Sequence, residues 1–586
     1  MANEEKYCFQ FSTKPGVQRD GTDLDANLFN DAQHCRFQRG RPKKMGGYKA
    51  ISQSLAGPVR AVFVWSRQAL NSIFSFSPTG VEVLTADSNG AGANLTNRTP
   101  VIRTLTTTVI ATGTVSVGHL VTGTTSTSTG VVASFTGTVP NLTITLAYVS
   151  AAFNNGEALT FSSSGTTTAT ATAGVYTSTA FTTNTNSTWQ VDSMYDAAAN
   201  SGKSIIIAHA ANNLVNIDDN TPSPVYIGDI SATGALESIG QSVSGGVVAC
   251  PPYMLLYGSD GKVQWSNANE PLNYATGEAN TTRVTGAKVV RGMSIRGNGQ
   301  SPSALFWSLD SVIKMNYVGG TAVFRFDPVS SQSSILSSNS VVEYDGTFFW
   351  AGVDRFLMYN GAVKELPNDQ NLNYFYDNLN YDNRQKVWAM KVPRFGEVWW
   401  FFPSGASTEC DKAVIYNVRL NAWYDTNMAR SAGYYSQVFR FPTMADSAAD
   451  GVSGKYTAWL HESGYDKVIG NNQTAIQSYF ETSDFGLPTG GPVSEQLQGL
   501  NRWTRLTRVE PDFVQVGDMS MQVTGYEFAR GEYKVSAPYV FTPGTGKIDT
   551  REQRREIRLR FESNTLGGNY EMGKVLMHLE PGDVRS

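Results

Sequence analysis

The sequence predicts an all-β protein, on the evidence of its composition and its short hydrophobic runs. Aromatic residues make up 11% of the 586 residues and charged residues only 16%, whereas charged residues form about 25% of an average chain. β-Branched and aromatic residues gather in short runs bounded by glycine, asparagine and aspartate, as in strands joined by tight turns. Amphipathic helical periodicity is scarce.

The clearest predicted hairpin lies between residues 341 and 367. Two β-prone runs, 348–350 and 356–359, flank a turn at 352–354, and Asn360-Gly361 turns the chain again because both residue types tolerate positive φ. Similar pairs recur. We expect pairing of 74–76 with 81–84, 205–208 with 214–217, 254–257 with 262–265, 305–309 with 312–317, 399–402 with 413–416 and 457–461 with 467–470.

The spacing of these hairpins predicts a β-propeller of six or seven blades. Radial arrays of four-stranded blades repeat at about 40 to 50 residues. An ordinary set of meandering sheets is the alternative, because its hairpins would also recur regularly. The markers on the return strands are 48, 50, 44 and 57 residues apart, at Asn216, Gln264, Lys314, Met358 and Ile415.

Composition divides the chain into four regions. Residues 104–188 contain 27 threonines and a single fully charged residue, Glu157, yet their aliphatic residues alternate as in strands. We expect a small inserted β domain there. The other expected regions are an N-terminal docking arm at 1–50, the propeller at 51–103 and 189–487, and a C-terminal β-sandwich-like module at 493–586.

Smaller features complete the expected fold. Residues 371–383 predict a long loop or a short helix, and 444–454 predict a loop. In the C-terminal region, Ile557, Leu559 and Phe561 alternate with charged residues, which predicts a strand with one buried and one charged face. The same alternation places Leu506 and Val509 on opposite faces of an earlier strand.

Two basic clusters are the candidate interface. A net charge of −4 and a pI near 5.9 argue against a nucleic-acid clamp, for which a pI above about 9 is expected. The first cluster could be solvated or paired within the chain, dock a protein, or contact phosphates; the second could dock a protein or protect a strand edge. The candidate residues are Arg36, Arg39, Arg41, Lys43 and Lys44, with Arg551, Arg554, Arg555 and Arg558.

No catalytic, cofactor or metal site is predicted, and we expect the protein not to be an enzyme. The five histidines lack HExxH or H-x-H spacing, and 259–265 misses the sialidase Asp-box and predicts a hairpin turn instead. Asp20, Asp23 and Asp25 lack the ligand order of a calcium loop. Four scattered cysteines predict isolated buried thiols, at Cys8, Cys35, Cys250 and Cys410.

No membrane span or secretory signal is expected. No run of about 18 apolar residues occurs, and residues 1–7 are polar. Synthesis in a cytoplasm is therefore the expectation.

Both ends of the chain carry strings with a family resemblance. GVQRDGT at 16–22 and CRFQRGRPKKMGGY at 35–48 resemble the N-terminal region of tail nozzle or hub proteins of short-tailed bacteriophages, often described as packaged-DNA stabilisation proteins. The string at 558–586, RLRFESNTLGGNYEMGKVLMHLEPGDVRS, resembles their C-terminal ends. The strings cover a small part of the chain but bracket it, and the family has a propeller fold.

The resemblance implies a structural virion protein of the tail, made in the host cytoplasm. It implies a homo-oligomeric ring, usually a hexamer, that attaches to the head-to-tail adaptor, carries tail fibres or spikes, closes the DNA channel, and conducts double-stranded DNA without binding it specifically. The competing hypothesis is a receptor-binding or polysaccharide-degrading tail spike, or a glycan-binding β-propeller. A spike would be a trimer, and a cleaving enzyme would need two opposed acids.

Overall fold

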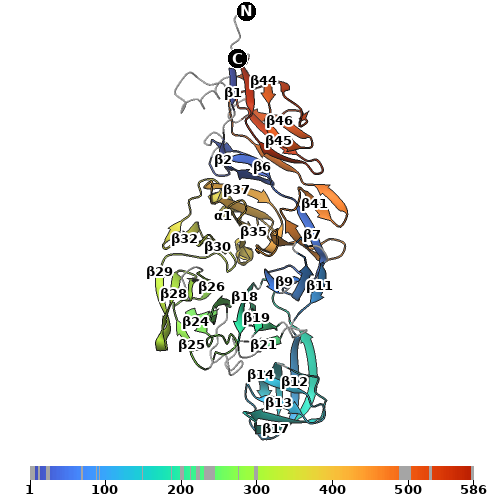
Figure 1. Ribbon diagram of the computed structural model, residues 1–586, viewed down its shortest axis with the longest axis vertical. Helices are drawn as coiled ribbons and strands as arrows, with labels where there is room; N and C mark the ends of the chain where they lie inside the picture. The colour runs from blue at the N-terminus through green and yellow to red at the C-terminus, as the bar shows by residue number, and fades with distance from the viewer. Residues whose placement is uncertain are drawn as a thin grey trace, which may run out of the picture.

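The computed structural model consists almost entirely of β-strands, which confirms the predicted all-β, propeller-like fold class (Figure 1). It describes residues 7–582 apart from 11–12, 22–26, 68–69, 88, 91–92, 100, 148, 187, 198–202, 211–212, 219–224, 230–244, 275, 296–300, 487–502 and 527–530. Within these described residues, no helix is long and apolar enough to cross a membrane.

Seven sheets built mainly from consecutive antiparallel strands follow one another along the described chain. Their registers match most of the predicted hairpins, with Phe348 opposite Tyr359 and Trp399 opposite Ile415. The first six sheets are β8 (Ala61–Arg67), β9 (Leu70–Ser77), β10 (Gly80–Ala86) and β11 (Asn94–Asn97); β18 (Trp189–Asp196), β19 (Lys203–Ala210), β20 (Asn213–Asp218) and β21 (Val225–Asp229); β22 (Gly245–Cys250), β23 (Tyr253–Gly258), β24 (Lys262–Trp265) and β25 (Asn280–Arg283); β26 (Val289–Ser294), β27 (Ser303–Ser308), β28 (Val312–Gly319) and β29 (Val323–Ser330); β30 (Val341–Tyr344), β31 (Thr347–Ala351), β32 (Phe356–Tyr359) and β33 (Val363–Glu365); and β34 (Trp388–Val392), β35 (Glu397–Phe402), β36 (Lys412–Asn417) and β37 (Ala422–Asn427).

Apolar cores between consecutive sheets hold them in a ring. The rings of Phe76 and Trp189 join the first sheet to the second, with centroids 5.2 Å apart. The following pairs share further clusters of buried side chains. Phe63 of the first sheet lies 5.9 Å from Tyr434 of the seventh, so the series returns to its start, and Figure 1 shows the sheets arranged around a centre.

The seventh sheet is completed by a strand from the N-terminal region. Its order is β38 (Arg430–Tyr434), β39 (Thr443–Asp446), β40 (Tyr456–His461), β7 (Tyr48–Leu55), β41 (Asp466–Ile469) and β42 (Asn472–Ala475). Strand β7 pairs antiparallel with β40 and parallel with β41. The predicted pairing of 457–461 with 467–470 is therefore wrong, because a distant strand occupies the position between them.

The threonine-rich insertion forms a closed six-stranded barrel at the end of the molecule opposite the termini (Figure 1). Its single carboxylate, Glu157, accepts hydrogen bonds from the backbone N–H groups of Thr125, Ser126 and Asn154 at 2.6–3.0 Å. The only full charge of this region is therefore used to hold its loops together. The strands are β12 (Val101–Gly113), β13 (Leu120–Gly123), β14 (Thr129–Thr138), β15 (Asn141–Ala147), β16 (Ala158–Ser163) and β17 (Thr166–Ala180).

The module at the other end combines both ends of the chain, so residues 1–50 do not form the separate arm that was predicted. Strands from the N-terminal region enter its sheets and then supply β7 to the propeller. Its sheets are β1 (Tyr7–Gln10), β52 (Leu576–Pro581), β44 (Thr504–Glu510) and β49 (Ile548–Arg554); β4 (Asp31–Gln33), β43 (Ser478–Glu481), β50 (Arg558–Ser563), β46 (Met519–Tyr526), β47 (Tyr533–Val535) and β48 (Tyr539–Phe541); and β45 (Phe513–Val516), β51 (Asn569–Met572), β6 (Arg41–Lys44) and β5 (Cys35–Gln38), with β2 (Lys14–Val17) and β3 (Leu28–Phe29) paired alongside.

Local structure confirms one sequence expectation, the short helix, and departs from three others. Helix α1 (Leu372–Asn378) is the short helix expected within 371–383, whereas β39 occupies the start of the loop expected at 444–454. A β-bulge between Leu506 and Arg508 brings both Leu506 and Val509 into the core. The charged face of β50 is not exposed as expected, because Arg558 is 3% exposed and Arg560 and Glu562 are partly buried. The expected boundary at 488–492 lies outside the described residues.

Closure of the ring by β7 can be tested at Lys49, which pairs with Leu460 on one side and Val468 on the other. Its side chain is exposed, so Lys49→Pro removes a ladder N–H without disturbing the core. We expect the free energy of unfolding to fall by about 3 kcal/mol or more, measured by urea denaturation. Lys49→Gln keeps the N–H and should change it by less than about 0.5 kcal/mol; equal curves for the two variants would contradict the closure.

The barrel should be separable from the propeller. Thr104 and Thr177 are directly paired at its base, so a Gly-Gly link can replace residues 105–176 as a tight turn. We expect thermal unfolding of the shortened protein to remain cooperative, because the seven sheets keep the cores between them. Loss of that transition would show that the barrel supports the propeller.

Candidate functional site

The first predicted basic cluster is divided between the interior and the surface. Arg36 is 1% exposed and lies between two carboxylates of the propeller. Its Nε donates to Glu397 Oε1 at 2.9 Å, and its Nη1 and Nη2 donate to Glu462 at 2.7 and 2.6 Å. Arg36 therefore cannot contact another protein, and its prediction as an interface residue is wrong.

The surroundings of Arg36 explain this burial. Strand β5 lies against the propeller, and the Phe395 ring covers the guanidinium at 3.5 Å. Tyr424 and Trp399 donate further hydrogen bonds to Glu397 at 2.7 and 2.9 Å. Burial raises the pKa of Glu397; burial acts in the same direction on Glu462, but the Arg36 guanidinium outweighs it and lowers the pKa of that carboxyl. The network joins the module to two propeller sheets.

The remaining members of the first cluster differ in exposure. Lys44 is 1% exposed, and burial lowers its pKa to about 8. Its prediction as an interface residue is therefore also wrong. Lys43 pairs with Glu571 at 3.2 Å and is partly exposed. Arg39 and Arg41 are exposed on the β5–β6 hairpin. They stay predicted interface residues.

The second predicted cluster is likewise divided, with two of its four arginines buried. Arg558 donates to both Asp484 carboxylate oxygens at 2.7 and 2.8 Å. Arg554 is 7% exposed and pairs with Glu552 at 2.8 Å. These two residues support the module, which corrects the expectation that they dock a partner. Arg551 is exposed and Arg555 partly exposed.

The sequence reading missed an apolar part of the module surface. On edge strand β45, Val514 is 77% and Val516 is 56% exposed. Val514 lies opposite Glu571, and Glu571 lies opposite Lys43, so these residues share one sheet face. The propeller covers the β5 end of this face at Arg36 and leaves the β45 end open. The sequence signal for this surface was the placement of Val514 and Val516 two residues apart in FVQV, which puts both on one face of a strand.

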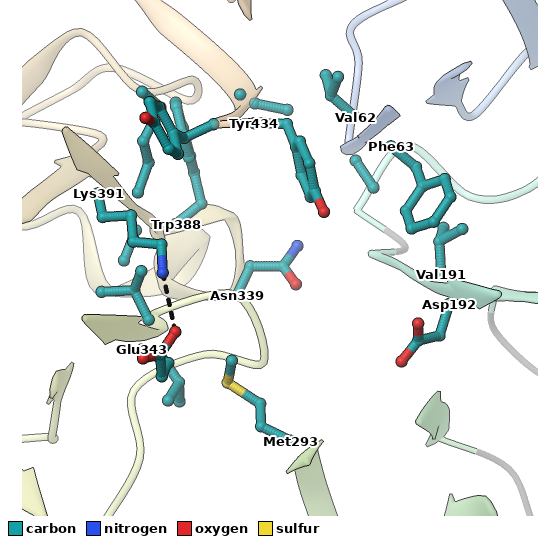
Figure 2. Close-up of a pocket in the computed structure, with 18 of the residues that line it drawn as sticks. Val62, Phe63, Val191, Asp192, Met293, Asn339, Glu343, Trp388, Lys391 and Tyr434 are labelled. Carbon is teal, nitrogen blue, oxygen red and sulfur yellow. Dashed lines mark hydrogen bonds and ion pairs between the residues drawn. The ribbon is translucent and has the colours of Figure 1, made fainter. Parts of the chain in front are cut away.

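A second candidate site is the cavity at the centre of the propeller, with a volume of about 620 Å³. Side chains from the innermost strand of every sheet line it, and Figure 2 shows Phe63, Asp192, Asn339 and Tyr434 around one space. Lys391 and Glu343 form an ion pair of 2.8 Å on its wall. The hairpin spacing predicted a propeller, but sequence gave no signal for the polarity of its centre.

Other titratable groups serve the fold. Burial lowers the pKa of His34 to about 4 and that of His209 to about 3. The structure contains no cluster of three potential metal ligands among the residues it describes. Asp20 accepts hydrogen bonds from the N–H groups of Asn373 and Tyr374 at the start of α1, whereas Asp23 and Asp25 lie outside the described residues.

The four cysteines are free thiols. Cys35, Cys250 and Cys410 are buried as expected, but Cys8 on β1 is exposed, which corrects its predicted burial.

Comparison with known proteins adds little. No protein-family model and no curated protein matches the sequence. Among solved structures, the chain is similar to BamB from Moraxella catarrhalis, with 11% identity over 71% of this chain and 97% of that chain and a TM-score of 0.33. At this TM-score the likeness carries no argument about function.

The Arg36 network should be strongly coupled. Arg36→Met leaves Glu397 and Glu462 buried without their cation, and we expect it to lower the free energy of unfolding by about 3 to 5 kcal/mol. In a double-mutant cycle measured by urea denaturation, Arg36→Met with Glu397→Gln should cost clearly less than the sum of the single variants.

Lys43→Met is the matched control, because the Lys43–Glu571 pair is 28% and 30% exposed and should be worth less than about 1 kcal/mol. Additive effects of Arg36→Met and Glu397→Gln would contradict the network.

Proposed function

We propose that the protein is a structural subunit of a short bacteriophage tail, one of a ring that forms the nozzle or hub below the head-to-tail adaptor. The observation that carries the proposal is the meeting of the two resemblance strings. Residues 35–38 and 41–44 form β5 and β6, residues 558–563 and 569–572 form β50 and β51, and β6 pairs with β51.

That meeting turns two distant strings into one surface. Both strings resemble the same protein family. Their pairing in the fold explains this, because residues that are distant in the sequence then form one functional unit. The unit lies at one end of an elongated molecule (Figure 1) and exposes Arg39 and Arg41. The adjoining strand β45, which lies outside both strings, exposes Val514 and Val516. An apolar centre flanked by arginine is the composition of a protein docking face. We assign this face to the adaptor or the neighbouring subunit.

Charge supports a conduit that does not hold DNA. Six copies would carry 6 × (−4) = −24 formal charges. Each phosphate contact steepens the dependence of log K on log salt by about 0.9 and would retard a moving duplex. Arg36, Arg554 and Arg558 are bound by carboxylates inside the fold, so they are not offered to phosphates.

The internal use of charge also favours a structural role. In the described part of the chain, the strongly buried ionic groups around Arg36, Arg430 and Arg558 connect separate elements of the fold. Catalysis would instead require such groups to converge on a substrate.

The docking face can be tested with Arg39→Glu/Arg41→Glu. Both side chains are exposed, so we expect wild-type stability but loss of incorporation into tails, measured by complementation of a phage lacking the protein and by native mass spectrometry with the adaptor. The matched control is Arg325→Glu/Arg440→Glu, which makes the same charge change at exposed propeller positions and should assemble normally.

Normal assembly of the first variant would contradict the docking face. A stable wild-type trimer that cleaves surface polysaccharide would contradict the nozzle itself and favour a tail spike.

A further inference from the structure

We propose that the axial cavity of the propeller is a binding site for a neutral saccharide. Its volume of about 620 Å³ falls within the range of about 300 to 1,000 Å³ typical of small-molecule sites. The innermost strands of all seven sheets form its wall, so its shape is fixed by the ring closure. The inference does not depend on the proposed tail function.

The charges of the cavity wall cancel, which favours an uncharged ligand. Lys391 is neutralised by Glu343 at 2.8 Å, and the other wall charges are two cations and two anions. A ligand with net charge would exchange full hydration for a wall without a matching excess of charge. The charged residues of the wall are Arg60, Arg291 and Lys391 against Asp192, Glu343 and Asp345.

Donors and acceptors are close together and held in place. Asp192 accepts the N–H groups of Ser193 and Ala249 at 2.8 and 2.9 Å, which fixes its carboxylate. The Asn339 amide is held by Gln190 at 2.9 Å. Arg291 also lines the cavity, and its Nε is buried with no hydrogen-bond partner among the described residues.

A hydroxyl group matches this wall better than other polar groups. It donates one hydrogen bond and accepts two, so adjacent hydroxyls can serve a carboxylate and a neighbouring donor at the same time. Figure 2 shows Asp192, Asn339 and the Tyr434 hydroxyl directed towards the same space. A ligand with several hydroxyls on a rigid frame would hydrogen-bond to more than one of these groups at once.

Two aromatic rings supply the complementary apolar surface. Phe63 and Tyr434 are half-buried, with centroids 5.9 Å apart and planes inclined by 55°. Sugar rings have an apolar C–H face and a polar hydroxyl edge, and aromatic side chains bury such a face at little conformational cost. The wall therefore combines aromatic rings with fixed polar groups, and this combination indicates a saccharide.

The full-length protein would be titrated by isothermal calorimetry and saturation-transfer NMR. The neutral probes are glucose, galactose, N-acetylglucosamine and disaccharides of each, and the charged probes are glucuronate and inorganic phosphate. We expect at least one neutral probe to bind with one-to-one stoichiometry and a Kd of about 1 mM or tighter. Met293→Trp, which enlarges a side chain that lines the cavity (Figure 2), should raise that Kd at least about tenfold.

Two milder variants keep the test valid if Met293→Trp does not fold. Asp192→Asn and Glu343→Gln retain shape but alter hydrogen bonding, and each should raise the Kd several-fold, whereas Arg325→Gln on the exposed surface should not. Thermal unfolding verifies the fold of every variant. Failure of all neutral probes to bind at about 10 mM, tighter binding of glucuronate or phosphate, or undiminished binding by the folded cavity variants would each overturn the proposal.

Discussion

The pairing of β7 on both of its edges is the constraint on which the rest of the structure depends. A ring of sheets is stable only if the last sheet packs against the first, and here the last sheet contains a strand from the start of the chain. Antiparallel pairing with β40 and parallel pairing with β41 satisfy the polar backbone of β7 on both sides. This closure sets the spacing of all seven innermost strands, and therefore the dimensions of the axial cavity.

The same strand places the N-terminal segment where it joins the C-terminal module. Residues 35–44 leave the module as β5 and β6 and continue directly into β7. Arg36 then lies where the module meets the sixth and seventh sheets, with Glu397 on β35 and Glu462 just after β40. Burial of three charged groups is costly unless each is paired and hydrogen-bonded. Tyr424, Trp399 and the Gly46 N–H complete that requirement.

The two ends of the molecule have contrasting surfaces. The barrel carries only two full charges, Arg103 on β12 and Glu157, and it uses Glu157 internally. Threonine hydroxyls and scattered aliphatic side chains such as Val139 and Val175 face solvent. The module instead combines arginines with exposed valines on an edge strand. The barrel lacks an excess of charge for long-range electrostatic attraction, whereas exposed arginines beside exposed valines suit a protein contact. This contrast in surface chemistry is the basis for proposing the module as the docking end.

The sequence by itself determined the local elements. Neighbouring strands joined by a tight turn need only adjacent residues, so pairings such as Phe349 with Met358, the β-structure of the threonine-rich insertion and the alternation of Ile557, Leu559 and Phe561 could be predicted. Only the tertiary structure decided which distant segments meet. Strand β7 enters a sheet formed some 400 residues later in the chain, and Arg36 pairs with Glu397, 361 residues away. A basic run in the sequence is the same whether its carboxylate partners are distant residues of the chain or residues of another protein. The burial of Arg36 could therefore not be predicted from the sequence. The cavity likewise arises only when the ring closes, because its wall takes one strand from each sheet.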